Sequence, residues 1–217
     1  MQVFKYMTVT TQLAEDNGIK AILLTAEDVN LAASLLYVAY HDDPIFKEIF
    51  DGTKEGYDTR LRGAIREELS AFWQTQQPMI GLFSGPHLLG VACLIEPQKG
   101  LEPERFWHWR LKMMLHAGFL STQNMIEKEK KVATAIPHEH YHLLTFIAIH
   151  PDHQHHGLGQ YLVKAVDSIV SENQISEGVA VFVTKENNKP LFDGDNYETL
   201  TNITIGDVAG TLMFRNK

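Results

Sequence analysis

Hydrophobic residues follow two periodicities along the chain, and each predicts a different kind of element. Runs that are apolar or rich in β-branched residues predict strands at residues 19–24, 79–83, 88–95, 141–149, 178–184, 199–205 and 208–215. Apolar positions three and four residues apart predict amphipathic helices over residues 29–40, 57–73 and 158–169. Pro44 ends the first helix, because a residue before proline disfavours the helical conformation. This succession predicts an α/β protein with a mixed sheet of about seven strands flanked by helices.

The segment before the fourth strand has a different character. Residues 102–135 predict an inserted pair of helices, the second of which is charged and ends before Pro137. One helix face is predicted from Trp107, Leu111, Met114, Leu115 and Gly118. Two interpretations stay open for Trp107, Trp109, Met113 and Met114: they line an aromatic acceptor pocket, or they are ordinary helix packing. The strand at 141–149 is almost wholly apolar, which predicts burial on both of its faces.

Composition narrows the class of protein. The chain has 217 residues and a net charge of −8, with 44% hydrophobic residues, so we expect a single globular domain spanning 1–217. No basic stripe is present to bind a phosphate backbone, which argues against a nucleic-acid partner. No long apolar run predicts a membrane span or a signal peptide. The single Cys93 excludes an internal disulfide, and we expect a cytoplasmic protein, monomeric or homodimeric.

The junction at 149–159 carries the clearest chemical signal. A buried strand ends there, a polar loop follows, and Gly157-Leu158-Gly159 opens the next helix. Backbone N–H groups at a helix start lack intrahelical partners, and with the helix dipole they favour a polyanion. The dinucleotide fingerprint needs a third glycine where Leu162 stands, and the Gly-Lys-Ser/Thr ending of a P-loop is absent. Tight strand–helix packing is the alternative explanation of the two glycines.

Residues 147–159, IAIHPDHQHHGLG, resemble the strand and the Gln-x-x-Gly-x-Gly loop of the GNAT superfamily of N-acetyltransferases. Further segments resemble its puromycin N-acetyltransferase-like branch, in the expected order: residues 39–44, 188–192 and 212–215. The resemblance implies a GNAT-like α/β fold and an acetyl-CoA-dependent N-acetyltransferase. The acceptor it implies is the primary amine of a small molecule, which attacks the thioester directly.

The resemblance also implies residues that hold the coenzyme. The loop at Gln154, His155, His156, Gly157, Leu158 and Gly159, with Gln160 after it, would bind the pyrophosphate. Ile147 and Ile149 would present backbone groups to the pantetheine arm where the fourth and fifth strands splay apart, and Asn188 and Phe192 would lie beside that arm. An N–H around Ile147–Ala148 would stabilise the tetrahedral oxyanion.

The catalytic side chains are less well defined. The family's usual tyrosine proton donor is replaced by Phe192, and Tyr161 or Tyr197 is a possible substitute. We predict His142 and Glu139 as the groups that remove the amine proton, although an edge-of-sheet histidine hydrogen-bonded to backbone is the competing interpretation. We predict that Thr145 and Asp43 contact the substrate.

Two other functions follow from the same residues. A catalytically weak acyl-CoA-binding or sensing module is suggested by Phe192, and a protein or peptide amine is an alternative acceptor. Seven of the 11 histidines lie between residues 138 and 156, and the His-x-His-x-His pattern at 138–142 is geometrically able to hold a metal. Because the second His group overlaps the anion loop and no Cys or carboxylate pair completes a shell, we expect no metal.

Overall fold

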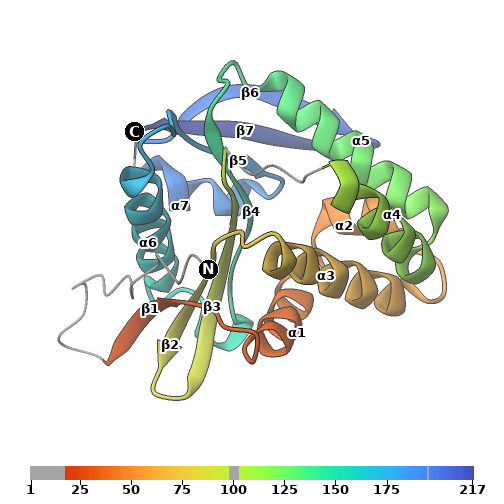
Figure 1. Cartoon of the computed structure of the whole chain (residues 1–217), viewed down its shortest axis with the longest axis horizontal. Coiled ribbons are helices and arrows are strands. Elements are labelled where there is room, and N and C mark those ends of the chain that lie inside the picture. Colours follow the sequence, from red (N-terminus) through yellow and green to blue (C-terminus); the bar gives the residue numbers. More distant parts are fainter. Residues whose placement is uncertain (1–17, 98–102, 195) are drawn as a thin grey trace.

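The fold is built on one seven-stranded sheet, as the resemblance to the GNAT-like fold predicts (Figure 1). The computed structural model describes residues 18–97, 103–194 and 196–217, without the side chains of 103–108. The strands are β1 (Ile19–Leu23), β2 (Met79–Ser84), β3 (His87–Ile95), β4 (Tyr141–Ile149), β5 (Gly178–Val183), β6 (Glu198–Ile205) and β7 (Val208–Asn216). Their spatial order is β1-β2-β3-β4-β5-β7-β6, and only the pair β4–β5 is parallel. The mixed α/β sheet predicted from the hydrophobic pattern is therefore confirmed.

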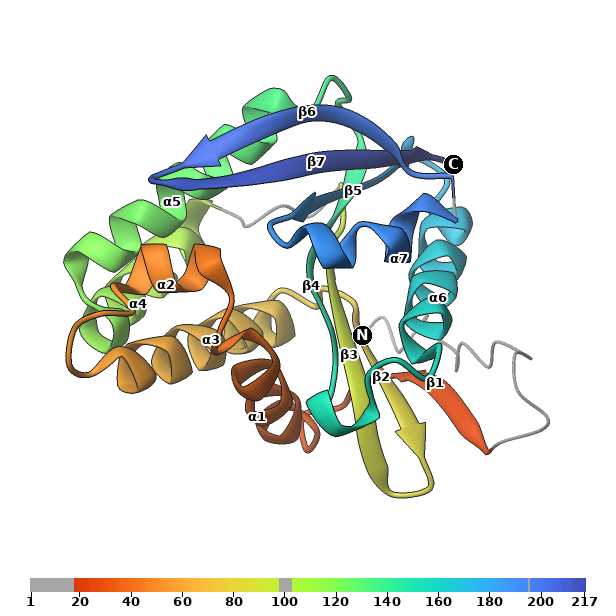
Figure 2. The same cartoon turned by 180° about the vertical axis from the view of Figure 1, so that it is seen from behind.

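Helices cover both faces of this sheet (Figures 1 and 2). On one face lie α1 (Val29–Tyr40), α2 (Pro44–Phe50), α3 (Tyr57–Gln74), α4 (Pro103–Ala117) and α5 (Phe119–Ala135). On the other face lie α6 (Leu158–Glu172) and the short α7 (Pro190–Asp193), with the 3-10 turns η1 (Pro151–His153) and η2 (Glu186–Asn188) in the connecting loops. Among the described helices, none is long and apolar enough to cross a membrane.

Each face has its own hydrophobic cluster. Buried residues of α1, α2 and α3 pack on Val91, Cys93 and Phe146 of the central strands. The buried stripe of α6, which includes Leu162 and Val166, packs instead on Leu94, Leu144 and other residues of the opposite face. Alternation along β3 sends successive side chains to opposite clusters. The sheet is therefore the shared wall between two separately packed layers.

The predicted apolar face of the first inserted helix is wrong. Leu111 and Leu115 are 58% and 75% exposed, whereas Trp109, Met113 and Ala117 are buried. These three positions lie four residues apart, so they form a second possible stripe on the same helix. Trp109 and Met113 thus pack as ordinary helix residues, and the side chain of Trp107 lies outside the described residues.

Strand β4 is also not buried uniformly on both faces. Its side chains alternate between buried and half-buried from Tyr141 to Ile147. Tyr141 and Leu143 face the layer that contains α5, whereas Ile147, beyond the irregularity between Leu144 and Phe146, packs with the cluster of α6.

A buried carboxyl lies between the helices of that layer. Glu68 on α3 is 3% exposed, and burial, reinforced by the nearby Glu129 carboxylate, raises its pKa well above the usual range. Lys128 and a hydrogen bond from Trp109 oppose this shift only partly. The fold therefore favours the protonated carboxylic acid, because ionising it at this depth is costly.

We expect this proton to make folding stability depend on pH. The folded protein keeps a proton that the unfolded chain releases above about pH 4.3, so the free energy of unfolding falls as the pH rises from there toward the raised pKa. Glu68→Gln removes this titratable group. The decrease in the free energy of unfolding over this pH range should therefore be smaller in the variant by at least about 1.4 kcal/mol, which corresponds to one pKa unit. Chemical denaturation between pH 5 and 8.5 measures it. Glu127→Gln, on the exposed side of α5, is the control, and equal slopes for the two variants would contradict the prediction.

Candidate functional site

The site is organised by a local break in the sheet. β4 and β5 pair from Tyr141–Gly178 to Leu144–Val181, and beyond that point β4 continues beside β3 alone. At the same place the register against β3 shifts, because Cys93 and Leu94 pair with Phe146 and Leu144. Thr145 is the extra residue of this β-bulge, and bulges re-aim side chains and end strand pairing. The predicted splay between the fourth and fifth strands is therefore present.

The loop that follows β4 is exposed and leads into α6. Residues 151–157 are all exposed, and Gly157 precedes the helix with a φ of +76° in open space. This left-handed conformation is the reason for glycine there, since other residues adopt it at a cost. Gly159 has a different reason, because a Cβ at this position would lie 2.8 Å from Leu191 of α7. Gly159 thus permits close packing of α7 on α6, while Gly157 shapes the turn.

The N-terminus of α6 has the features of an anion site. The helix has no side-chain N-cap hydrogen bond, so its first backbone N–H groups face the exposed loop. Gln154 anchors this loop to the strand by donating from Nε2 to the carbonyl of Ile149 at 3.0 Å. His155, in a left-handed conformation, and His156 are both exposed beside it. The arrangement can receive a polyanion at the end of the splay.

A tyrosine that was not predicted as a site residue bonds the open edge of β4 at the splay. The hydroxyl of Tyr40, the last residue of α1, donates to the carbonyl of Ile147 at 2.9 Å and accepts from its N–H at 3.1 Å. Both groups of Ile147 therefore point away from β3, although the residue itself lies opposite Ala92 of that strand, as in a non-hydrogen-bonded antiparallel pair. Of the predicted pair Ile147–Ala148, the N–H of Ile147 is the one that faces the splay, and in this structure it donates to the tyrosine oxygen.

Asp43 lies at the α1–α2 corner, on the β5 side of the splay. Its carboxylate caps α2 by accepting from the N–H of Ile45 at 3.0 Å, and it accepts from the hydroxyl of Thr184, just after β5, at 3.1 Å. Burial raises the pKa of Asp43, while these donors and Lys185 oppose the shift. The corner therefore places a carboxyl group at the ends of two elements that are distant in sequence.

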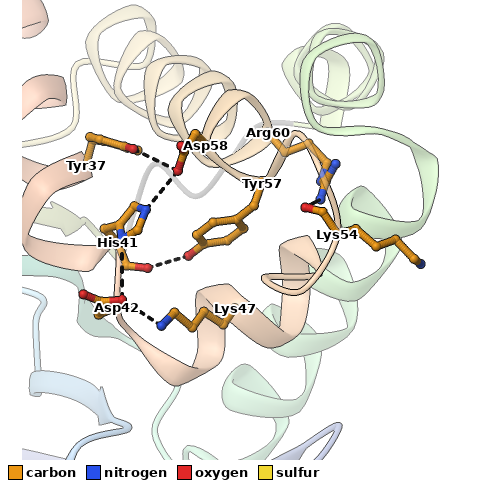
Figure 3. Close-up of polar contacts among 8 residues, drawn as sticks. All are labelled: Tyr37, His41, Asp42, Lys47, Lys54, Tyr57, Asp58 and Arg60. Atoms are coloured by element: carbon orange, nitrogen blue, oxygen red, sulfur yellow. Dashed lines mark hydrogen bonds and ion pairs between the residues drawn. The ribbon is translucent and has the colours of Figure 1, made fainter.

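A polar network outside the splay holds this corner in place (Figure 3). Asp58 of α3 contacts both Tyr37 and His41, and the hydroxyl of Tyr57 donates to the carbonyl of His41 at 2.8 Å. Arg60 donates to backbone carbonyls of the α2–α3 connection, including those of Phe50 and Glu55. These contacts tie α3 to the end of α1 and so fix the position from which Tyr40 and Asp43 project.

The predicted acid–base pair lies at the other end of β4. His142 precedes Ile147 by five residues, which is about 16 Å along a strand. Its ring is fully buried, and Nδ1 donates to the Ser176 hydroxyl at 2.8 Å, since that hydroxyl itself donates to the carbonyl of Gly178. Burial lowers the pKa of His142 to about 4. Glu139 is exposed in the loop before the strand. Neither side chain faces the splay.

The remaining predicted site residues divide between the core and the splay. Phe192 and Tyr197 are buried in contact, with ring centroids 5.1 Å apart. Asn188 is exposed in η2 after β5. Gln160 donates from its side chain to the carbonyl of Leu191, which fastens α7 to α6. Thr145 lies at the bulge, and its buried hydroxyl makes no hydrogen bond to any described residue.

The histidines of the predicted metal alternative do not converge. His138 stacks on Phe214 and contacts the Glu177 carboxylate at 2.9 Å, whereas His142 turns to Ser176. Across residues 18–97, 103–194 and 196–217, no three His, Cys, Asp or Glu side chains are grouped as metal ligands would be. The pattern at 138–142 therefore serves the packing of this sheet end in the structure.

Comparison with known proteins yields one family and a set of similar folds. The family model described as the Acetyltransferase (GNAT) family matches residues 48–192. No curated protein sequence matches the chain. Among solved structures, a Corynebacterium glutamicum protein described as histone acetyltransferase HPA2 and related acetyltransferase is 14% identical, with a TM-score of 0.69 and coverage of 92% of this chain and 96% of that one.

Two further structures are similar over nearly the whole chain. A mosquito arylalkylamine N-acetyltransferase like 5b is 15% identical, with a TM-score of 0.62 and coverage of 92% and 100%. AAC(6')-Ib, solved with ribostamycin and coenzyme A, is 11% identical, with a TM-score of 0.54 and coverage of 92% and 94%. At these identities the likeness concerns the fold.

The buried His142 generates a test of its own. The folded protein holds this ring neutral down to about pH 4, whereas the unfolded chain takes up the proton near pH 6.5. The free energy of unfolding should therefore fall as the pH drops from about 6.5 toward 4. His142→Asn keeps a donor toward Ser176 but cannot titrate, so it should reduce this loss in denaturant titrations at pH 4.5 and 7. An unchanged pH dependence would contradict the burial argument.

Proposed function

Because the chain belongs to the Acetyltransferase (GNAT) family, whose members use acetyl-CoA, we propose that this acyltransferase moves an acetyl group from acetyl-CoA to a small primary amine. The observation that carries the proposal is the splay of β4 from β5 beside the exposed start of α6. An extended coenzyme arm can pair with an open strand edge, and its phosphates suit a helix N-terminus. No other part of the described chain combines these two features.

We place the pyrophosphate on the loop from Gln154 to Gly159. The exposed backbone between η1 and α6 offers amide groups, and Gly157 leaves open space beside them. The pantetheine arm would then run along the free edge of β4 toward Thr145. Ile149 would serve this arm and Ile147 the thioester. Asn188 is exposed just after β5, on the side of the splay opposite to β4. Gln160 and Phe192 would support the loop indirectly, through the packing of α7 on α6.

The acceptor is proposed to enter at the α1–α2 corner. A primary amine is an ammonium ion at neutral pH, and Asp43 offers a carboxylate on that side of the splay. Its raised pKa suits it to receive the amine proton before attack. The arylalkylamine and ribostamycin named for the similar structures are amines of this kind, as are acceptors of the puromycin N-acetyltransferase-like branch, which residues 39–44, 188–192 and 212–215 resemble.

The proposed reaction then needs few further groups. The neutral amine attacks the thioester carbon, and an oxyanion forms within reach of the N–H of Ile147. The nitrogen of the adduct gives its extra proton to water, and the C–S bond breaks. The coenzyme thiolate that leaves has a conjugate acid with a pKa of about 8.5, so water can protonate it. Phe192 offers no hydroxyl for this step and is buried against Tyr197. A thiol-release assay with acetyl-CoA and a panel of amines tests the proposal, and coenzyme binding without turnover would favour a sensing module.

The turn at Gly157 provides a specific test of coenzyme binding. Gly157→Ala places a residue with a Cβ in the left-handed backbone conformation, so it should lower the free energy of unfolding by about 1 kcal/mol. Gly85→Ala is a matched control, because Gly85 also has positive φ in open space but lies in the β2–β3 hairpin. We expect calorimetry to show at least a tenfold weaker affinity for coenzyme A in Gly157→Ala alone. Equal affinities in both variants would place the coenzyme elsewhere.

The role of Asp43 is tested by Asp43→Asn. Asparagine still caps α2, so the fold should survive, but the charge that attracts an ammonium and takes its proton is lost. We expect kcat/KM for the amine to fall at least tenfold, while the KM for acetyl-CoA changes little. Asp42→Asn alters the exposed neighbour that pairs with Lys47 and should leave both constants unchanged. A higher KM for acetyl-CoA with an unchanged kcat/KM for the amine would refute this assignment.

A further inference from the structure

The contact between Tyr40 and Ile147 joins the acceptor side of the site to the strand that carries the coenzyme edge. One phenol oxygen satisfies both backbone groups of a single β4 residue, at 2.9 and 3.1 Å, across 107 positions of sequence. Those two groups would otherwise pair with a neighbouring strand, and β5 has already turned away at Val181. The hydroxyl therefore takes the place of a missing strand partner at the branch of the sheet.

The aromatic cluster around Tyr40 fixes where this hydroxyl lies. Its ring contacts Phe46 and Phe146 edge-on, with centroid separations of 5.2 and 5.7 Å, and these two phenylalanines stack on each other. The clamp comes from α2 and from β4 itself. The hydroxyl is thus positioned by the strand it bonds and by the helix that follows the corner.

The position of the Tyr40 oxygen has a chemical meaning under the proposed function. An acyl oxygen that accepts from the N–H of Ile147 must lie about 3 Å from that nitrogen, along the N–H direction. The Tyr40 oxygen already lies there. A thioester can therefore reach this N–H only when the phenol moves aside by about one oxygen diameter, which leaves its O–H beside the incoming oxygen.

We infer that Tyr40 is a second hydrogen-bond donor of the acyl site, which holds the place of the thioester oxygen in the free protein and donates to that oxygen once acetyl-CoA is bound. The inference rests on the proposed function. During attack the amine lone pair forms the C–N bond, and the carbonyl π pair moves onto oxygen. Ile147 N–H and Tyr40 O–H both donate to this oxyanion. The added nitrogen then gives its extra proton to water, and when the carbonyl re-forms, the C–S bond breaks and its electron pair leaves on sulfur, which water protonates.

Tyr40 acts here as a donor that keeps its proton. Burial, with a contribution from the negative charge of Asp43, raises the pKa of Tyr40 well above its ordinary range. The hydroxyl therefore stays protonated at neutral and mildly alkaline pH. This separates its role from that of the family's usual tyrosine, which gives a proton to the leaving thiolate and which Phe192 replaces.

The test uses Tyr40→Phe, which keeps the ring and its packing but removes the donor. Infrared spectra of bound acetyl-CoA labelled with carbon-13 at the carbonyl, recorded without amine, report hydrogen bonding to the thioester oxygen directly. We expect the carbonyl band to lie at higher frequency in the variant than in the unchanged protein. With an amine acceptor, kcat should fall about 10²-fold to 10³-fold, as for loss of one oxyanion donor, while affinity for coenzyme A, which has no acyl oxygen, stays within threefold.

Tyr141→Phe is the matched control, because it removes a hydroxyl from β4 itself but at the end of the strand that lies six residues before Ile147. It should change neither the carbonyl band nor kcat. An identical band and kcat in Tyr40→Phe and the unchanged protein would overturn the inference while the proposed function stands. Failure of the unchanged protein to bind acetyl-CoA would instead overturn the proposed function. A melting temperature lowered equally in both variants, with a band shift in Tyr40→Phe alone, would support the donor role.

Discussion

The parting of β4 from β5 is the constraint on which the rest of the site depends. The parallel pairing ends at Leu144, next to the bulge at Thr145, so one edge of β4 lies open within the sheet rather than at its border. Open backbone groups inside a protein need partners, and here Tyr40 and Gln154 supply them from two different elements. The break therefore draws a helix end and a loop to the same strand edge, which concentrates polar groups in a layer otherwise built from hydrophobic contacts.

Most of the fold could be predicted from the sequence because its elements have clear periodicities. The strands and the helices α1, α3 and α6 follow their hydrophobic patterns closely. The inserted helix α4 shows the limit of this approach, because two apolar stripes coexist on it and the pattern does not say which stripe meets the core. The seven-residue α2 was missed, since so short a helix is specified by the Asp43 cap, by Pro44 and by packing rather than by periodicity.

The candidate site was predicted unevenly for a physical reason. The loop from Gln154 to Gly159 is contiguous in sequence, so its residues can be recognised together as one motif. Tyr40 and Ile147 are far apart in sequence, and Ala39-Tyr40-His41 contains no signal that the middle side chain reaches a strand edge. His142 was favoured for its chemistry, but the strand parity that buries it on the α6 side could be read only once the register was known.

The separation of the two hydrophobic layers by the sheet has a consequence for how such proteins diversify. The loop and α6 belong to one layer, whereas the α1–α2 corner belongs to the other, and the buried side chains of the two layers form separate clusters on opposite faces of the described sheet. Substitutions that are distant and have no common partners act nearly independently. Inherited changes can therefore remodel one layer while the opposite layer keeps its shape, and Tyr40 is the exception, since it is anchored in one layer and bonded to the strand that both share.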